Sequence, residues 1–183
     1  EKIKILSAYK KRGFETFEVS PIYGDAEKII GKNCKNKNLI WKLPKIPKKK
    51  ENLDLWINII FKDSLRKLGE KKIDILMIHE SKDLLGKYGE EIYKIIKNLK
   101  DKGFVKHLGV SVYKKNILNK IIKKFKIDVV QLPFNILNYE FEEKDLFFLK
   151  KKNKNLKIHA RSIFHQGLLL KKIKSRNKKF KNL

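Results

Sequence analysis

The sequence predicts a single domain over residues 1–183 with an α/β fold, an incomplete (β/α)8 (TIM) barrel. Two observations predict it. Six short β-rich segments alternate with helical segments, which is typical of parallel strands joined by right-handed helical crossovers. Polar residues also fall at or just after the C-terminal end of each predicted strand, where barrel enzymes place their chemistry. These residues are Glu18, Lys42, His79, Ser111, Gln131 and the pair Arg161–Ser162.

The predicted strands are short runs rich in β-branched and other apolar residues. In chain order they cover residues 16–19, 39–41, 73–78, 107–112, 127–132 and 156–163. Between them, apolar residues recur at helical spacing over residues 53–68, 88–99 and 118–125. The sequence given also begins with a predicted amphipathic helix. The Lys-rich segment 45–52 is predicted to be a loop, and the basic segment 173–183 a loop or the approach to another helix.

A doubly wound open sheet is the alternative that the same alternation allows. That fold usually carries a three-glycine fingerprint after its first strand, or a phosphate-binding P-loop, and neither is present. Polar residues at the ends of successive strands would converge on one rim of a barrel. The barrel is therefore the favoured architecture.

Composition narrows the possible function classes. Only four of the 46 basic residues are Arg, although Arg is the residue that reads bases and phosphates in a bidentate manner. The net charge of +26 is therefore interpreted as a usage bias towards Lys, without nucleic-acid binding. A single cysteine, Cys34, indicates a reducing compartment, and no apolar run is long enough to cross a membrane. These features predict a cytoplasmic protein without a membrane partner.

A first segment and five later ones occur in an order that resembles the aldo-keto reductase family. The first contains Glu18, Tyr23-Gly24 and Glu27…Gly31, and the later ones are Trp41-Lys42, Asp74…His79, Gly103…Ser111, Asp128…Gln131 and Arg161-Ser162. The Arg-Ser pair and the Gln166-Gly167-Leu168 motif after it resemble a bacterial branch of that family. No single segment is specific, but their order and their positions on the predicted strands are.

The resemblance implies an oxidoreductase that uses NADPH to reduce aldehyde or ketone groups of small molecules, without a metal. It implies Tyr23 as proton donor, Lys42 as the cation that lowers the Tyr23 pKa, Glu18 as the anchor of Lys42, and His79 as a neutral donor to the substrate oxygen. It also implies a set of cofactor-binding residues: Ser111, Gln131, Arg161, Ser162, Gln166, Gly167 and Leu168. His107 and His159 lie early in their predicted strands and are expected to be structural.

The chain departs from the family pattern at three of these positions. Glu18 stands where the family carries Asp, so Asp at this position is expected to keep or raise activity. Val112 follows Ser111 where many members carry Asn, and Arg161 stands where many place an aromatic ring. The Glu18 substitution favours a second hypothesis, a non-catalytic barrel that binds a nucleotide or a partner protein, whereas Tyr23, Lys42 and His79 argue against it. The basic charge gives a third hypothesis, a nucleic-acid-binding module, which the scattered distribution of Lys disfavours.

The resemblance also implies that the barrel is cut. A first strand is expected before Glu1, and an eighth strand and the last helices after Leu183. The piece alone is expected to be inactive and poorly soluble, because unpaired strand edges favour aggregation. The family's loop for the adenosine 2′-phosphate would lie in the part that follows. Substrate identity and oligomeric state are not predicted.

Overall fold

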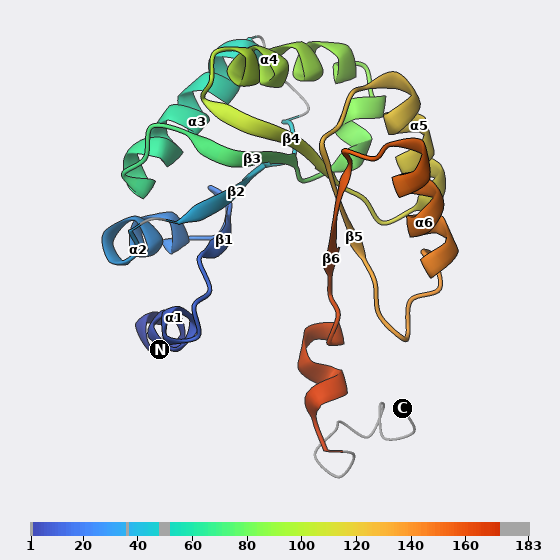
Figure 1. Ribbon diagram of the computed structural model, residues 1–183. Coiled ribbons are helices and arrows are strands. Elements are labelled where there is room, and N and C mark those ends of the chain that lie inside the picture. Colours follow the sequence, from blue (N-terminus) through green and yellow to red (C-terminus); the bar gives the residue numbers. More distant parts are fainter. Residues whose placement is uncertain (1, 36, 48–51, 173–183) are drawn as a thin grey trace.

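The computed structural model describes residues 2–35, 37–47 and 52–172 of the chain. One parallel sheet has its six strands side by side in chain order. The strands are β1 (Thr16–Val19), β2 (Asn38–Leu43), β3 (Ile73–Ile78), β4 (Val105–Ser111), β5 (Val129–Pro133) and β6 (Lys157–Arg161). Figure 1 shows that this sheet curls into an arc, with α2 to α6 on its convex side and an opening between β1 and β6. A closed TIM barrel has eight strands, so the described residues form an incomplete one.

Helices follow the strands as the (β/α) pattern requires. They are α1 (Lys2–Lys11), α2 (Ala26–Asn33), α3 (Leu53–Leu68), α4 (Gly89–Asp101), α5 (Lys115–Lys124) and α6 (Glu143–Lys152), with 3-10 helices η1 (Ser81–Leu85) and η2 (His165–Leu170). The ends of α3 show why such boundaries form. The Asn52 side chain accepts a hydrogen bond from the Leu55 amide at 2.8 Å, and the helix stops at Gly69 with a φ of 67°.

The hydrophobic core has two parts because side chains alternate across the sheet. The larger part lies between the sheet and the helices, where Trp41 packs edge-to-face on Phe61 with ring centroids 5.3 Å apart. The smaller part lies on the concave side and contains Ile40, Ile75, Met77 and Val129. The polar residues of the rim continue the concave face beyond this small apolar layer.

Two aspartates of the sequence motifs hold neighbouring strands together. Asp74 on β3 accepts a hydrogen bond from the Leu39 amide at 2.9 Å, and Asp128 before β5 accepts one from the Leu108 amide at 2.8 Å. A carboxylate that binds a backbone N–H of the next strand fixes the strand pairing at that point. The register of the sheet sets which residues reach the rim.

The predicted strands 16–19 and 73–78 are confirmed as drawn, and the other four are confirmed with shifted ends. The clearest error is the last strand, which stops at Arg161 instead of residue 163. Ser162 has a φ of 56°, a left-handed conformation that no strand continues. The segment 45–47 has no helix or strand, as predicted, while residues 48–51 and 173–183 of the predicted loops lie outside the described residues. None of the described helices has the length and hydrophobicity of a membrane span.

Candidate active site

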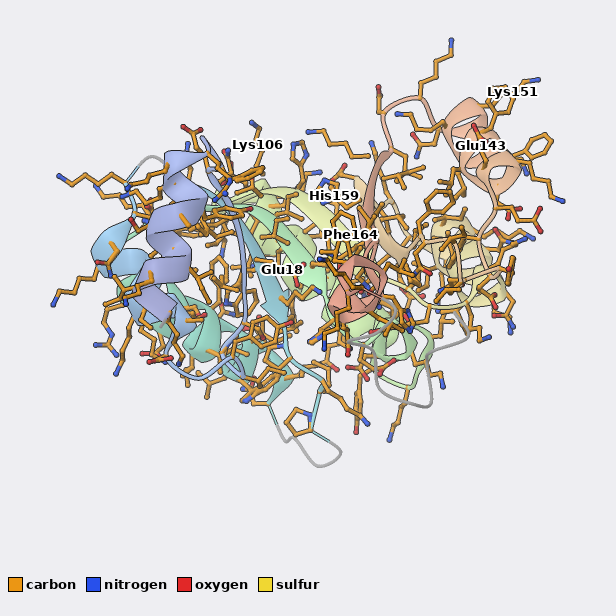
Figure 2. The ribbon with its side chains drawn as sticks, turned by 90° about the horizontal axis from the view of Figure 1, so that it is seen from below. Glu18, Lys106, Glu143, Lys151, His159 and Phe164 are labelled. Carbon is orange, nitrogen blue, oxygen red and sulfur yellow. The ribbon has the colours of Figure 1, made fainter. Side chains whose placement is uncertain are left out.

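The C-terminal ends of the strands carry the polar residues that the sequence places there. Glu18 and Lys42 are the penultimate residues of β1 and β2, His79 follows β3, and Ser111 ends β4. Gln131 lies in the middle of β5, where it pairs in register with Ser111. Parallel strands bring these positions to one end of the sheet. Figure 2 looks onto the open side and shows Glu18 within the concavity.

The centre of the site is an ion pair between Glu18 and Lys42. The Lys42 ammonium lies 2.8 Å from Glu18 Oε1, and its side chain is only 4% exposed, while that of Glu18 is 33% exposed. The Lys42 backbone is also held, because the buried Ser20 hydroxyl donates to its carbonyl oxygen at 2.9 Å. A buried ammonium needs such a partner, since an unpaired charge in the interior is costly. The role expected for Glu18, to anchor Lys42, agrees with this contact.

The second oxygen of Glu18 is also bound. The Gln131 side-chain amide donates to Glu18 Oε2 at 2.6 Å, and the Ser111 hydroxyl donates to Gln131 Oε1 at 3.2 Å. Both Ser111 and Gln131 are buried. Lys42, Glu18, Gln131 and Ser111 therefore form one continuous polar chain that lines the inner wall from β1 and β2 to β4 and β5.

Tyr23 and His79 lie beside this chain. Tyr23 sits in the turn after β1, where its backbone amide donates to the Ser20 carbonyl at 2.9 Å. Its ring meets the His79 imidazole edge-on, with centroids 6.1 Å apart. Tyr23 is 38% exposed, so its phenol is open to a small molecule in the concavity.

The surroundings shift the pKa values of these groups in directions that matter for proton transfer. Burial lowers the pKa of His79 and Lys42 lowers it further, which favours the neutral imidazole that the sequence predicts. Burial lowers the pKa of Lys42, against the stabilising effect of Glu18. Burial and then Glu18 raise the pKa of Tyr23.

Lys42 is not among the groups that shift the pKa of Tyr23 here, so the expectation that Lys42 lowers that pKa stays a prediction. Lys42 is paired with Glu18 at 2.8 Å, so the pair presents little net positive charge to the phenol, and the carboxylate raises its pKa. The cation that opposes this rise is Arg161. A phenol with a raised pKa stays protonated at neutral pH, which is the form that a proton donor needs.

Arg161 closes the site from β6. Its guanidinium stacks on the Tyr113 ring, 4.0 Å from the ring centroid, and Nη1 donates to the Ser162 hydroxyl at 3.3 Å. Nε and Nη2 of Arg161 are buried without a hydrogen-bond partner among the described residues. Buried guanidinium donors normally have partners, so these two N–H-bearing atoms are available to an acceptor of a bound molecule.

Three predicted cofactor residues lie apart from this cluster. Gln166, Gly167 and Leu168 belong to η2, beyond the end of β6, and no hydrogen bond in the described part of the chain joins them to the polar chain. Ser162, Gln166 and Gly167 all have positive φ values, of 56°, 55° and 84°. The backbone here turns sharply away from the strand. The structure therefore leaves the cofactor role of these residues as a prediction.

Two neighbours of the site were not singled out from the sequence. Tyr113 supports Arg161 and, placed two residues after Ser111 at the same rim, could have been found from its spacing. His159 was expected to be structural because it lies early in the predicted strand. It pairs in register with Gln131, and Figure 2 shows it on the concave side with Glu18, whose charge acts on its pKa. The strand ends at Arg161, two residues earlier than predicted, so His159 lies only two residues from its C-terminal end.

The described residues contain no group of three or more His, Cys, Asp and Glu side chains that could hold a metal ion. The polar groups that the site gathers are a phenol, an imidazole, an ammonium–carboxylate pair and a guanidinium.

The curled parallel sheet and its polar rim define the class of the protein as an incomplete TIM barrel with an enzyme-like site at the C-terminal ends of its strands. Comparison of the sequence with known families gives the particular family. The profile of the Aldo/keto reductase family matches residues 1–182, and the chain belongs to that family. No curated protein sequence matches the chain significantly.

Solved structures with the same fold are numerous and distant in sequence. An aldo-keto reductase from Bacillus halodurans, in its holo form, superposes with a TM-score of 0.72 at 21% identity and covers 91% of this chain and 58% of its own. An aldo/keto reductase from Brucella melitensis gives 0.67 at 26% identity, covering 93% and 66%. An aldo-keto reductase complexed with NADPH gives 0.62 at 16% identity, covering 82% and 49%. The chain thus spans between about half and two thirds of the length of these proteins.

Proposed function

We propose that the protein carrying this chain reduces aldehyde or ketone groups of small molecules, with NADPH as reductant and Tyr23 as proton donor. The observation that carries the proposal is the Glu18–Lys42 ion pair, 2.8 Å long, at the rim beside the Tyr23–His79 ring pair. The proposal is supported by membership in the aldo/keto reductase family and by a solved relative that was complexed with NADPH.

Each residue of the cluster has a role that follows from its environment. His79, kept neutral by burial and by Lys42, donates a hydrogen bond to the carbonyl oxygen and orients it towards Tyr23. Tyr23 is protonated at neutral pH, as a phenol with an ordinary pKa of about 10 already is, and it transfers that proton to the developing alkoxide. Lys42, which Glu18 holds in place at 2.8 Å, is proposed as the cation that assists loss of the Tyr23 proton.

The residues of the inner wall fit a nicotinamide cofactor. Gln131 uses one amide hydrogen for Glu18 and one carbonyl lone pair for Ser111, so one donor and one acceptor remain for a carboxamide. Arg161, with two buried atoms that lack partners, supplies a flat cationic surface and further donors. The cofactor would supply the hydride to the carbonyl carbon. Ser162, Gln166, Gly167 and Leu168 are proposed to complete its binding site.

Two observations favour a second candidate function. The raised pKa of Tyr23 and the replacement of the family's Asp by Glu18 are also compatible with a barrel that binds a nucleotide or a partner without catalysis. In that case the polar chain would serve binding alone.

Transfer of deuterium from labelled NADPH to a panel of aldehydes and ketones tests the proposal. Wild-type protein should give labelled alcohol, Tyr23→Phe should lose most of the turnover while keeping cofactor affinity, and Tyr139→Phe is the control, because Tyr139 is 81% exposed. Binding of NADPH without any labelled product would favour the non-catalytic function. Near wild-type turnover by Tyr23→Phe would refute the assignment of the proton donor.

A further inference from the structure

The contact between Glu18 and Gln131 joins strands that are far apart in the sheet. Glu18 lies on β1 and Gln131 on β5, and β2, β3 and β4 run between them. Strands lie about 4.8 Å apart, so a flat sheet would separate these backbones by roughly 19 Å. The 2.6 Å contact exists because the sheet curls and because both side chains point into the concavity. It is a direct link across the interior of the barrel.

The length of Glu18 suits this link. Its two oxygens divide between two partners, with Oε1 at 2.8 Å from the Lys42 ammonium and Oε2 at 2.6 Å from the Gln131 amide. An Asp side chain would end about one carbon–carbon bond, roughly 1.5 Å, closer to β1. It could not meet both partners in their present positions. The extra methylene group therefore lets one carboxylate bridge β2 and β5.

Gln131 is itself held in place and can act as a fixed support. It is 5% exposed, and its carbonyl oxygen accepts from Ser111, which is 1% exposed and pairs with it in register. This bond turns the amide group so that its N–H side faces Glu18. Glu18, by contrast, is one third exposed on a strand at the edge of the sheet, and water competes for its carboxylate. Gln131 therefore holds the more exposed partner of the ion pair.

We propose that Gln131 is a positioning residue, which holds the Glu18 carboxylate against Lys42 through its side-chain amide and so fixes the charge beside Tyr23. The inference rests on the proposed function in one respect: the charge beside Tyr23 affects catalysis only if Tyr23 is the proton donor. The role of Gln131 proposed here is a contact within the protein and is separate from any contact with a cofactor.

Ionisation of Tyr23 reports where the Glu18 carboxylate lies. The titratable and charged groups around that carboxylate are Lys42 on β2, Tyr23 in the β1–α2 turn, His79 after β3, and His159 and Arg161 on β6. Glu18 raises the pKa of Tyr23, so removal or displacement of its charge moves the phenol's titration to lower pH. Tyr113 also acts on the pKa of Tyr23. Tyrosines are the groups here whose ultraviolet absorbance changes on ionisation, and subtraction of a Tyr23→Phe titration isolates the signal of Tyr23.

The experiment is a double-mutant cycle in which the ultraviolet absorbance is followed as the pH is raised. The titration curve of the matching Tyr23→Phe protein is subtracted from each curve, which removes the signal of the other tyrosines. Glu18→Gln should shift the Tyr23 titration to lower pH. Gln131→Met, which keeps the side-chain length and removes the donor, should shift it in the same direction, and should add nothing in the Glu18→Gln background. Additive shifts, or an unshifted titration in Gln131→Met, would overturn the proposal.

Two further measurements keep the test decisive. If circular dichroism shows that Gln131→Met does not fold, Ser111→Ala replaces it. Ser111→Ala removes the donor to the Gln131 carbonyl and should shift the Tyr23 titration to lower pH by a smaller amount. An unshifted Tyr23 titration in Ser111→Ala would overturn the proposal. Deuterium transfer from NADPH is measured on the same variants. A protein that shows the non-additive titration but transfers no deuterium would refute the proposed function and leave the positioning role of Gln131 standing.

Discussion

Replacing Glu18 with Asp removes one methylene group from the centre of the site and should weaken it. The sequence alone led to the opposite expectation, since the family carries Asp here. In the structure the carboxylate is 2.8 Å from Lys42 and 2.6 Å from Gln131, and a retreat of about 1.5 Å lengthens both contacts beyond hydrogen-bonding distance. A hydrogen bond to a charged group contributes about 1.5–3 kcal/mol. Because Glu18 is one third exposed, water replaces part of that, and a net loss of roughly 1–2 kcal/mol is expected.

Thermal unfolding and steady-state kinetics measure the two consequences. For a chain of this length the loss corresponds to a decrease in Tm of about 2–8 °C. Misplacement of the ion pair by this distance should lower kcat by about a hundredfold. Glu15→Asp is the matched control, since Glu15 is exposed just before β1, and it should change neither value. An unchanged Tm with equal or higher kcat in Glu18→Asp would show that the length of Glu18 is not fitted to its two partners.

The remaining predictions concern the proton donor, the response to pH and the helix contacts. Tyr23→Phe should lower kcat by a factor of about 10² or more without weakening NADPH binding, as measured by fluorescence titration. Gly31→Ala should lower the Tm strongly, because a Cβ atom there would lie 2.2 Å from the Lys67 carbonyl oxygen; Gly86→Ala, where the nearest atoms are 3.6 Å away, should not. Stability should rise between about pH 5 and 7. Histidines whose pKa is lowered in the folded state stabilise the fold above their unfolded pKa of about 6.5, and this contribution is lost as the pH falls. A Tm that stays flat over this range would contradict the assignment of lowered pKa values. These histidines are His79, His107 and His159.

The fold was predictable from the sequence because its signals are local and repeated. Alternation of β-rich runs and apolar helical stripes depends on burial on the two faces of a sheet and on one face of each helix. The strand ends were less predictable. The stop at Arg161 depends on the positive φ of Ser162, which the apolar run into residue 163 conceals. Helix α6 has a weaker apolar stripe, and it was not identified beforehand.

Part of the site was predictable as a set of positions but not as a set of contacts. Strand ends and family order brought Glu18, Lys42, Ser111 and Gln131 to one rim, and the structure joins all four by hydrogen bonds. The bond between Glu18 and Gln131 could not be foreseen, because it depends on the curvature of the sheet. The upward shift of the Tyr23 pKa could not be foreseen either, because it depends first on the burial of the phenol and then on the position of the Glu18 charge.

Two lysines in this Lys-rich chain have almost the same environment, and their comparison separates stability from function. Lys37 lies 2.6 Å from Glu70, with the lysine side chain 3% exposed and the glutamate 32%. Lys42 and Glu18 show 4% and 33% at 2.8 Å. Burial and pairing therefore do not distinguish them. Their places in the barrel do distinguish them. Lys37 precedes the first residue of β2, at the end that serves stability in TIM barrels, and Lys42 is near the last residue of β2, at the end where TIM-barrel enzymes place their active sites.

Lys37→Met and Lys42→Met should therefore destabilise the fold by similar amounts and affect catalysis differently. Each leaves a partly exposed carboxylate without its cation, so each should cost about 1–3 kcal/mol, between the values for exposed and fully buried pairs. Only Lys42→Met should reduce kcat, by a factor of about 10² or more, and only it should raise the pKa of His79, because Lys42 lowers that pKa. Nuclear magnetic resonance titration of the His79 ring and chemical denaturation measure these quantities on the same samples. Equal loss of kcat in both variants would mean that the activity follows the stability of the barrel, and that Lys42 has no role of its own in the chemistry.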